Sequence, residues 1–577
     1  MVGGLRVRPR IDPRWVRTDG SRDCRGGPRD DRSAAGSDIP HSSSRAHRDR
    51  GGAVNPADLE ILQTGLSFIP EEMGVALRRT AYSPNIKERM DASCALFDAE
   101  GRIVAQAEHI PVHLGSMPVA VDAAMRDFPG TLREGDQIIL NDPYRGGTHL
   151  PDVTLIRPVF VRQLIIGFAV NRAHHADIGG RVPGSMPATA MRLEDEGLVL
   201  EPQKVMDRGR ERQAVVERFR QETMYPAERL GDLRAQIAAN ELGARRLVEL
   251  AERIGVANLR TSIEELLDYG ERRVRASIGE LPRGTWSAED FMEGASPDEP
   301  DRIRIRAEIT IGGSGIAVDF EGTDRQVAGN LNAPFAVTLS ATSYVMRCLT
   351  DPDAPRNAGA LRPLRVLAKE GSLVRPRPPA AVAAGNVETS QRIVDVLFLA
   401  LSEPLAETVP AQSQGTMNNV TIGGPDPRPF SYYETIAGGE GALPYRPGMA
   451  GVHTHMTNTR NTPIEALEFA YPLRIEEYRL IPGTGGRGQH SGGDGIRRSV
   501  RLLARKGTAS ILSERRALRP KGLEGGDDGR PGKNLLVRRG RRHGLPAKVT
   551  LELRLGDLLV IETPGGGGWG PPERRRR

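Results

Sequence analysis

Histidines gather in one part of the chain, beside acids that could share a metal ion with them. Five of the 11 histidines lie between His109 and His175. His149 and Asp152 stand three residues apart in Gly-Gly-Thr-His-Leu-Pro-Asp, and His174 and His175 follow in Asn-Arg-Ala-His-His-Ala-Asp. Two imidazoles and one carboxylate with open coordination positions suit Zn, Mn or Fe(II) and leave room for water or substrate.

A hairpin must bring these two segments together. Strand-type residues over 153–160 and 165–171 predict two strands that return His174 or His175 to the side of His149 and Asp152. Adjacent residues on a strand point in opposite directions, so we expect only one of the two histidines to be a ligand. The alternative is a set of loop histidines bonded to backbone carbonyls, which spacing alone leaves open.

Neighbouring side chains are candidates for supporting roles. Asp177, Glu108 and Asp142 could each orient an imidazole through its second nitrogen, as metal-bound histidines require, or could be solvated loop carboxylates. His113 and His109 could line the same cavity on the substrate side or be structural. The sequence therefore predicts a metal site with several polar groups around it.

Two glycine-rich segments resemble nucleotide motifs without the expected context. Residues 483–488 match the dinucleotide fingerprint, but no hydrophobic helix follows and no βαβ unit surrounds them. Residues 526–534 resemble a phosphate loop with one residue too many, and Asn534 stands where Ser or Thr would hold magnesium. Cys94 falls in a predicted strand, where a buried structural thiol is the default. We find no convincing ATP site in the sequence.

The surrounding pattern predicts a mixed α+β fold of several lobes, with hairpins, a central helical segment and a Gly-rich C-terminal β region. Apolar spacing indicates helices over 58–81, after Gly115 and over 226–279. Strand signals cover 94–98, 102–106, 137–140 and 302–320. No internal repeat is detectable.

Composition narrows the class of protein. The 12 Arg and 7 Asp of residues 1–54 give +5 and residues 573–577 give +3, which leaves −2 of the chain's +6 for the rest. Nucleic-acid binding is not expected, because it needs a basic stripe on the folded surface. No run approaches the ~20 apolar residues of a membrane span. Three cysteines without metal-type spacing fit a reducing cytoplasm.

Both ends differ from the body. Residues 1–54 are dense in Arg, Gly, Ser, Asp and Pro, and cannot bury enough apolar surface to offset chain entropy. We expect a disordered or untranslated extension over 1–54, a catalytic body over 55–572 and a basic tail over 573–577. Valine codons can serve as translation starts in bacteria, so Val54 is a candidate for the first residue of the native protein. Deletion of residues 1–53 is therefore expected to leave folding intact.

Several separated blocks carry a resemblance to a known family. Asn-Asp-Pro-Tyr-Arg-Gly-Gly-Thr-His-Leu-Pro-Asp and Asn-Arg-Ala-His-His-Ala-Asp-Ile-Gly-Gly are two of them, in an order that runs from about residue 55 to 572. The blocks are residues 83–98, 106–118, 141–152, 171–180, 385–392, 455–465 and 563–570. Together they resemble the hydantoinase B / oxoprolinase family.

The resemblance implies an enzyme with two components. Members of the family are B components of ATP-dependent hydantoinases, 5-oxoprolinases and subunits of acetone and acetophenone carboxylases. A hydantoinase A-like chain or domain handles ATP, so we expect a hetero-oligomer with ATP on the partner only. In the carboxylase branch the counterpart subunit holds a metal on positions that match His149, Asp152 and one of His174 and His175.

The resemblance leaves the reaction open. Ring opening of a hydantoin or 5-oxoproline-like amide after phosphorylation by the partner is the expected activity, with this subunit supplying a Lewis acid for the attack of water. ATP-dependent carboxylation of a ketone needs the same division of labour. A non-catalytic scaffold of the ATPase, and a free-standing metallohydrolase that needs no ATP, are the rivals from other classes.

Overall fold

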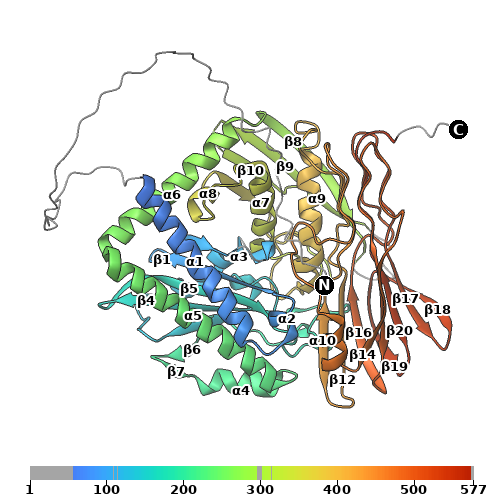
Figure 1. Ribbon diagram of the computed structural model, residues 1–577, viewed down its shortest axis with the longest axis horizontal. Coiled ribbons are helices and arrows are strands. Elements are labelled where there is room, and N and C mark those ends of the chain that lie inside the picture. The colour runs from blue at the N-terminus through green and yellow to red at the C-terminus, as the bar shows by residue number, and fades with distance from the viewer. Residues whose placement is uncertain (1–55, 108–109, 114, 295–301, 314, 573–577) are drawn as a thin grey trace, which may run out of the picture. The chain divides into compact units, whose positions relative to one another are not determined.

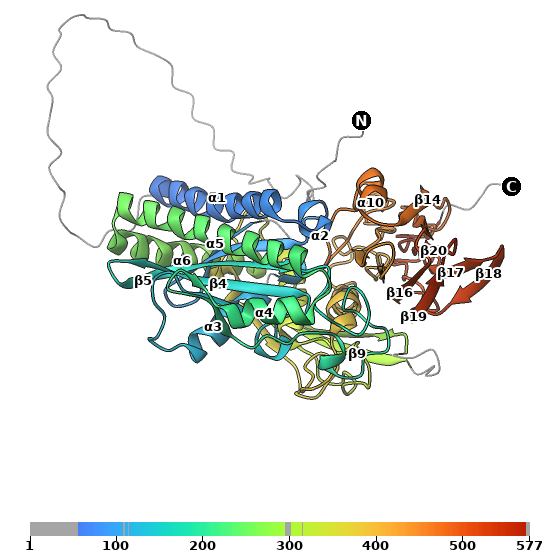
Figure 2. The ribbon, with the colours of Figure 1, turned by 90° about the horizontal axis from the view of Figure 1, so that it is seen from below.

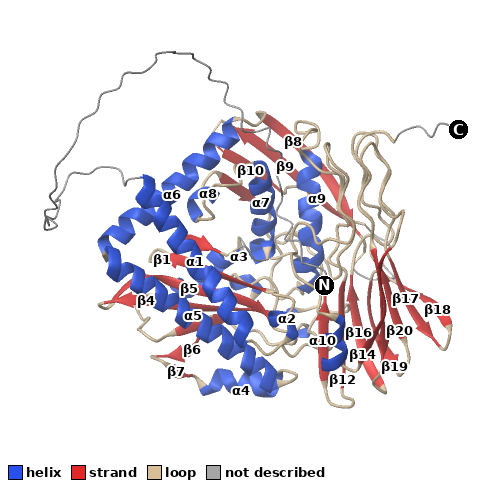
Figure 3. Cartoon of the chain, viewed as in Figure 1, coloured by secondary structure: helices blue, strands red, loops and turns tan. Residues whose placement is uncertain are grey.

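A computed structural model describes residues 56–107, 110–113, 115–294, 302–313 and 315–572 of the chain. Helices and several sheets alternate over this part, which confirms the α+β class (Figure 3). The helices are α1 Pro56–Thr80, α2 Pro84–Lys87, α3 Ser116–Asp127, α4 Gln213–Glu222, α5 Pro226–Ile254, α6 Val256–Gly279, α7 Phe335–Leu349, α8 Ala358–Leu361, α9 Ser390–Ala400 and α10 Ile464–Ala470, with short turns η2 Pro111–His113, η3 Pro143–Arg145 and η4 Leu193–Asp195 and a π-helical turn η5 Gly385–Thr389.

A seven-stranded sheet forms the N-terminal part of the fold. Its order is β2 Ile103–Gln106, β1 Ala92–Asp98, β5 Leu164–His174, β4 Asp152–Val161, β3 Gln137–Leu140, β6 Gln203–Asp207 and β7 Arg210–Glu211. Side chains alternate between the faces as a strand requires. Cys94 and Leu96 pack beneath α1 and α5, whereas Ala95 and Phe97 pack against α3 (Figure 2). Most residues of the central strands β1, β5, β4 and β3 are buried on both faces.

A second layer joins helices to a smaller sheet. Its order is β11 Leu364–Leu367, β10 Gly315–Asp319, β9 Ile303–Gly312 and β8 Gly284–Met292. Ile305 and Ile309 of β9 face α9, whose Leu397 belongs to the same core. Figure 1 shows α7 and α9 beside this sheet and η5 leads directly into α9.

The C-terminal part is a pair of antiparallel sheets around one core. One sheet has the order β13 Phe430–Glu434, β12 Asn419–Gly424, β16 Lys506–Leu512 and β19 Lys548–Arg554, and the other β14 Leu473–Leu480, β15 Ile496–Leu502, β20 Leu558–Glu562, β17 Lys533–Arg538 and β18 Arg541–Leu545. Ile422 and Ile511 from the first sheet share a cluster with Leu473 and Val500 from the second. Gly566 lies so close to another segment that a Cβ atom would stand 2.0 Å from the Glu440 carbonyl oxygen. The predicted Gly-rich β region is thus confirmed.

The expectations for the chain ends lie outside the described residues. Residues 1–55 and 573–577 carry no structural description, so the extension and the basic tail stay predictions. Within the described ranges, no helix combines the length and apolar character needed to cross a membrane.

Candidate metal centre

The β4–β5 hairpin positions the first part of the site. Antiparallel pairing sets Asp152, the first residue of β4, opposite His174, the last residue of β5. His149 lies in the turn just before β4, where its carbonyl accepts a hydrogen bond from the Asp152 amide at 3.0 Å. Residues paired across two strands share a face, so the two side chains meet. The predicted hairpin is confirmed, and it brings the two histidine segments together.

Three ligand-type atoms converge at the end of this hairpin. His149 Nε2 lies 3.2 Å from His174 Nδ1 and 3.2 Å from Asp152 Oδ1, and the last two atoms are 3.1 Å apart. Atoms that share a metal at ~2.0 to 2.2 Å stand roughly 3.0 to 3.5 Å from one another. All three residues are at most 2% exposed. The donor set therefore fits a divalent ion without rearrangement of the backbone.

Second contacts hold the Asp152 carboxylate in place. Its Oδ2 accepts a hydrogen bond from Thr148 Oγ1 at 2.5 Å and lies 3.4 Å from His113 Nε2. The other nitrogen of His113 lies 2.8 Å from Ser93 Oγ on β1. His113 is thus placed beside the cluster, as expected from the sequence, and its role stays a prediction.

The surroundings set the protonation of the cluster. Burial raises the pKa of the Asp152 carboxyl, but the charge of His149 and hydrogen bonds from His113, His149 and His174 outweigh burial and hold this pKa well below its usual range. Burial lowers the pKa of His174, against the hydrogen bond to Asp152. An ionised carboxylate and a neutral imidazole are the forms that bind metal.

His175 points to the other side of the sheet. Its Nε2 lies 2.9 Å from Gln236 Oε1 on α5, and its ring meets Phe219 of α4. Burial lowers the pKa of His175 to about 4. It does not join the cluster of His149, Asp152 and His174, because consecutive side chains alternate between faces. Of the two histidines named from the sequence as ligands, only His174 is placed for that role.

The cluster opens into a buried cavity of about 20 Å³, enough for a water molecule. Asp91, which precedes β1, contributes to its wall and accepts a backbone hydrogen bond from His174 at 3.0 Å. The ring of Tyr433 on β13 stacks on His174 with centroids 4.6 Å apart and planes 16° apart. Asn386 of η5 adds a buried side-chain oxygen without a partner among the described residues.

Sequence reasoning missed these three contributors. Asp91 lies beside a predicted strand, yet only the register of β1 on β5 shows that it meets His174. Tyr433 and Asn386 arrive from segments more than 200 residues further along the chain. The nearest signal in the sequence was Asp91 itself, an acid three residues before the predicted strand at Cys94.

Two other predicted acids lie elsewhere. Asp177 Oδ1 accepts hydrogen bonds from the amides of Gly179 and Met224, both at 2.9 Å, which uses its carboxylate to shape a loop. Asp142 accepts from the Tyr144 amide at 2.9 Å and caps η3. Neither lines the cavity among the described residues, and their expected role in orienting an imidazole stays a prediction. Glu108 and His109 lie outside the described residues.

The glycine-rich segments set aside above form no nucleotide motif in the described structure. Residues 483–488 lie in a loop, and residues 526–534 lead into strand β17 rather than into a helix. A phosphate loop needs a helix N-terminus directly after it. The interpretation of residues 483–488 as a loop is confirmed.

Comparison with known proteins settles the family. The chain matches Hydantoinase B/oxoprolinase over residues 55–572. It belongs to this family. An uncharacterized protein of Methanocaldococcus jannaschii is 42% identical over 520 residues, which cover 90% of this chain and 91% of that one.

Two further relatives carry named activities. The chain is similar to 5-oxoprolinase 1 of Arabidopsis thaliana, with 39% identity over 548 residues that cover 90% of this chain and 42% of that protein. It therefore spans about two fifths of the 5-oxoprolinase it matches. The crystal structure of ATP-dependent caprolactamase from Pseudomonas jessenii aligns with a TM-score of 0.85 and 28% identity over 90% of this chain and 92% of that one.

Proposed function

We propose that this chain is the metal-binding subunit of a two-component, ATP-dependent enzyme that opens a hydantoin or 5-oxoproline-like cyclic amide. The observation that carries the proposal is the convergence of His149 Nε2, His174 Nδ1 and Asp152 Oδ1 in a buried cavity. A divalent ion bound there would supply a Lewis acid. The names of the two relatives, a 5-oxoprolinase and a caprolactamase, supply the reaction class.

The residues of this chain would hold the ion in a defined way. His149, Asp152 and His174 would be the ligands, and the remaining coordination positions would be open to water or substrate. His113 fixes the second oxygen of Asp152, while Tyr433 fixes the plane of the His174 ring. Such outer contacts orient ligands and tune a metal site. The donors suit Zn, Mn or Fe(II) alike.

The ATP-dependent step is assigned to a hydantoinase A-like partner. Opening an unstrained amide is slow because amide resonance must be broken, and phosphorylation of the carbonyl oxygen by ATP supplies an electrophile with a good leaving group. The glycine-rich loops of the described residues lack the helix that would cradle phosphate. This chain matches only 42% of the longer 5-oxoprolinase, which leaves most of that protein for another task.

The proposal is tested by purifying the chain with a hydantoinase A-like subunit and assaying a panel of hydantoin, 5-oxoproline, caprolactam and acetone with bicarbonate. We expect ATP consumption that depends on an amide substrate and on both chains, and a complex with an interface above ~2,000 Å². ATP hydrolysis by the isolated chain would contradict the division of labour. Activity on acetone alone would replace ring opening with ketone carboxylation, and full amide hydrolysis without ATP would indicate a free-standing hydrolase. A partner that is fully active when His149 is replaced would leave this chain a scaffold.

A further inference from the structure

Three threonines contribute to the wall of the cavity that holds the metal cluster. They are Thr435, directly after β13, and Thr457 and Thr459 in the segment before α10. Each is at most 7% exposed. The hydroxyl oxygens of Thr435 and Thr459 lie 2.7 Å apart, so one donates its hydrogen to the other. This hydroxyl pair has no role in the metal cluster itself.

A buried arginine determines which way the hydroxyl pair points. Arg89 Nη2 donates to Thr435 Oγ1 at 3.0 Å and lies 3.5 Å from Thr459 Oγ1. A guanidinium cannot accept a hydrogen bond, so both oxygens spend a lone pair on Arg89. Arg89 is fully buried and is held from behind by Asn85 Oδ1 and by the Tyr433 carbonyl at 3.2 Å. The hydroxyl hydrogens must therefore go elsewhere.

A count of these hydrogens leaves one without a partner. The pair has two hydroxyl hydrogens, and the 2.7 Å contact uses one of them. Within the described part of the chain, neither hydroxyl makes another hydrogen bond. Both residues line the cavity, so a bound molecule can accept the second hydrogen there. An unpaired buried donor is costly, which favours a ligand that satisfies it.

The charge behind the pair selects the kind of ligand. Arg89 places a fixed positive charge one hydrogen bond away from the cavity, and the nearest described carboxylate, on Asp91, is 3.9 Å from Nη2. A donor backed by a buried cation favours an oxygen that carries negative charge. The metal cluster serves the other need of the site, because its three electron-pair donors would bind a cation.

We infer that the Thr435–Thr459 hydroxyl pair binds the negatively charged oxygen of the substrate, with Arg89 as the residue that positions it. The inference rests on the proposed function and deepens it. When water adds to the carbon of the phosphorylated amide, the C=N π pair moves to the ring nitrogen, which takes up the protons of the added water. The added oxygen becomes an oxyanion that re-forms a C=O bond as the C–N bond breaks, and a hydroxyl hydrogen bond stabilises its charge. A phosphoryl oxygen of the activated amide offers the same chemistry.

The test compares Thr435→Val, Thr459→Val and the double variant with wild type, each purified with the hydantoinase A-like partner. Removal of a donor to a developing oxyanion typically lowers kcat by on the order of 10²- to 10³-fold, and we expect a loss of this size in the double variant. Thr459→Ser keeps the hydroxyl and should retain most of the activity. Thr338→Val is the matched control. Thr338 lies on α7, is also buried and is not among the residues that line the cavity, and its hydroxyl donates to the Val374 carbonyl at 2.7 Å.

Metal content separates this inference from the metal proposal. Every variant should bind as much metal as wild type; a double variant that keeps wild-type kcat, or that loses metal in proportion to kcat, would overturn the inference. If the double variant is insoluble, Thr459→Val against Thr459→Ser decides in the same way. Should wild type bind no metal, the metal proposal fails, while the shift in Tm that inorganic phosphate or 5-oxoproline induces in wild type but not in Thr459→Val still tests the pair.

Inorganic phosphate as an inhibitor distinguishes the two oxygens. A Ki for phosphate that rises with the loss of kcat assigns the pair to a phosphoryl oxygen. An unchanged Ki with the same loss of kcat assigns it to the oxygen that is added from water. Both results support the inference.

Discussion

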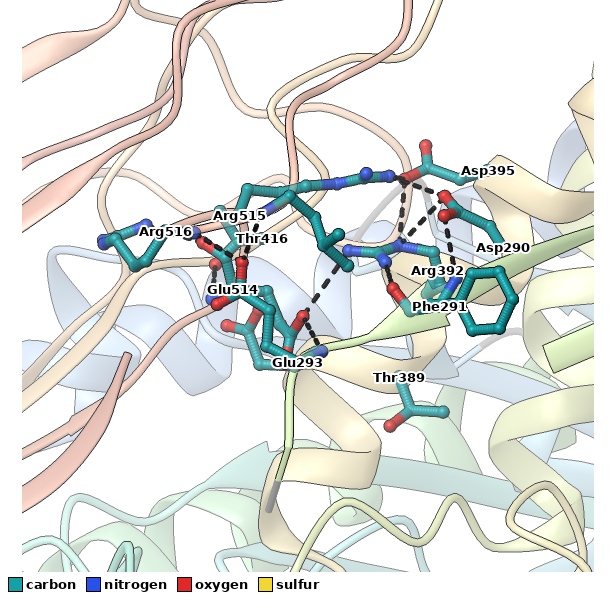
Figure 4. A network of polar contacts seen from close by, with 12 residues as sticks. Asp290, Phe291, Glu293, Thr389, Arg392, Asp395, Thr416, Glu514, Arg515 and Arg516 are labelled. Atoms are coloured by element: carbon teal, nitrogen blue, oxygen red, sulfur yellow. Dashed lines mark hydrogen bonds and ion pairs between the residues drawn. The ribbon is translucent and has the colours of Figure 1, made fainter. Parts of the chain in front are cut away.

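Two buried polar regions of this protein are built on opposite principles. In the ion network of Figure 4, Arg515 Nη2 lies 2.7 Å from Asp395 and 3.0 Å from Asp290, and Arg392 lies within 3.6 Å of Glu514. Opposite charges alternate, and the network joins β8 and α9 to the segment after β16. In the metal cluster, by contrast, His149, Asp152 and His174 direct three electron-pair donors at one another.

This difference in pairing distinguishes a structural polar core from a ligand-binding site. Buried charges that are paired with each other need nothing further, although removal of one partner is costly. Donor atoms that converge beside a cavity are satisfied only by a cation or by protons between them. Burial lowers the pKa of His174, which favours the neutral imidazole that a metal requires. The network therefore stabilises the packing of β8 and α9 against the segment after β16, whereas the cluster is the candidate site for a metal ion.

The largest expected effect comes from the two adjacent histidines. His174→Ala removes a ligand, so bound metal should fall from about one per chain to nearly none, and coupled turnover should fall by at least about 10²-fold. His175→Ala is the matched control, since His175 bonds to Gln236 on the other face and its loss should leave bound metal unchanged. Elemental analysis of both purified variants gives the answer. Equal loss of metal in both would show that the sheet face does not separate them.

Breaking the ion network should change stability rather than metal binding. Arg515→Ala leaves Asp290 and Asp395 to share Arg392, so one buried negative charge is uncompensated, and the free energy of unfolding should fall by about 3 to 5 kcal/mol. Arg362, half-exposed and 2.7 Å from Asp268, is the control, and its replacement by Ala should cost less than about 1 kcal/mol. Urea denaturation measures both. A variant of Arg515 as stable as wild type would remove the structural role of the network.

Glu388, a buried glutamate whose charge interacts with that of Glu514, should make stability depend on pH. Burial raises the pKa of Glu388 to about 8, while a carboxyl in the unfolded chain titrates near 4.5. The folded state therefore holds this proton more tightly than the unfolded chain does. The contribution of protonated Glu388 to the free energy of unfolding is complete below pH 4.5 and is lost as pH rises to 8. The free energy of unfolding of Glu388→Gln, relative to that of wild type, should rise by up to about 1.4 kcal/mol per pH unit over that window. Unfolding at pH 5, 6.5 and 8 tests this, and a difference that does not vary with pH contradicts it.

The smallest effect concerns the contact between the C-terminal sheet and the cluster. Tyr433→Leu removes the ring that stacks on His174, and metal affinity should fall about 10-fold because the imidazole loses its orientation. Tyr433→Phe keeps the ring and loses only the hydrogen bond from the hydroxyl to Asn419 Oδ1, 3.0 Å long. Competition with a chromophoric chelator measures both affinities. Equal losses in the two variants would assign the effect to the hydroxyl instead of the stack.

Local patterns predicted the part of the site that lies on one hairpin. Strand signals on either side of a short turn were sufficient to bring His149 and Asp152 to His174, because the pairing is local in sequence. The alternation of side chains predicted that one of His174 and His175 would face away, although not which. The helices over 58–81 and 226–279 were likewise readable from their apolar spacing.

Long-range pairing was not readable in the same way. Asp91 reaches His174 only through the register of β1 on β5, and Tyr433, Thr435 and Asn386 arrive through the packing of other layers. Asp177 was one of three acids predicted to orient an imidazole. In the structure, a backbone amide of its own loop donates a hydrogen bond to its carboxylate, because short loops satisfy their amides with the nearest acceptor.

The central claim is that His149, Asp152 and His174 hold one divalent ion. Element-specific anomalous X-ray diffraction from crystals of the purified chain tests it most directly. The account predicts a single strong peak at ~2.0 to 2.2 Å from His149 Nε2, His174 Nδ1 and Asp152 Oδ1. No peak at this position after reconstitution with Zn, Mn and Fe(II) in turn, or a peak coordinated by other residues, would contradict it.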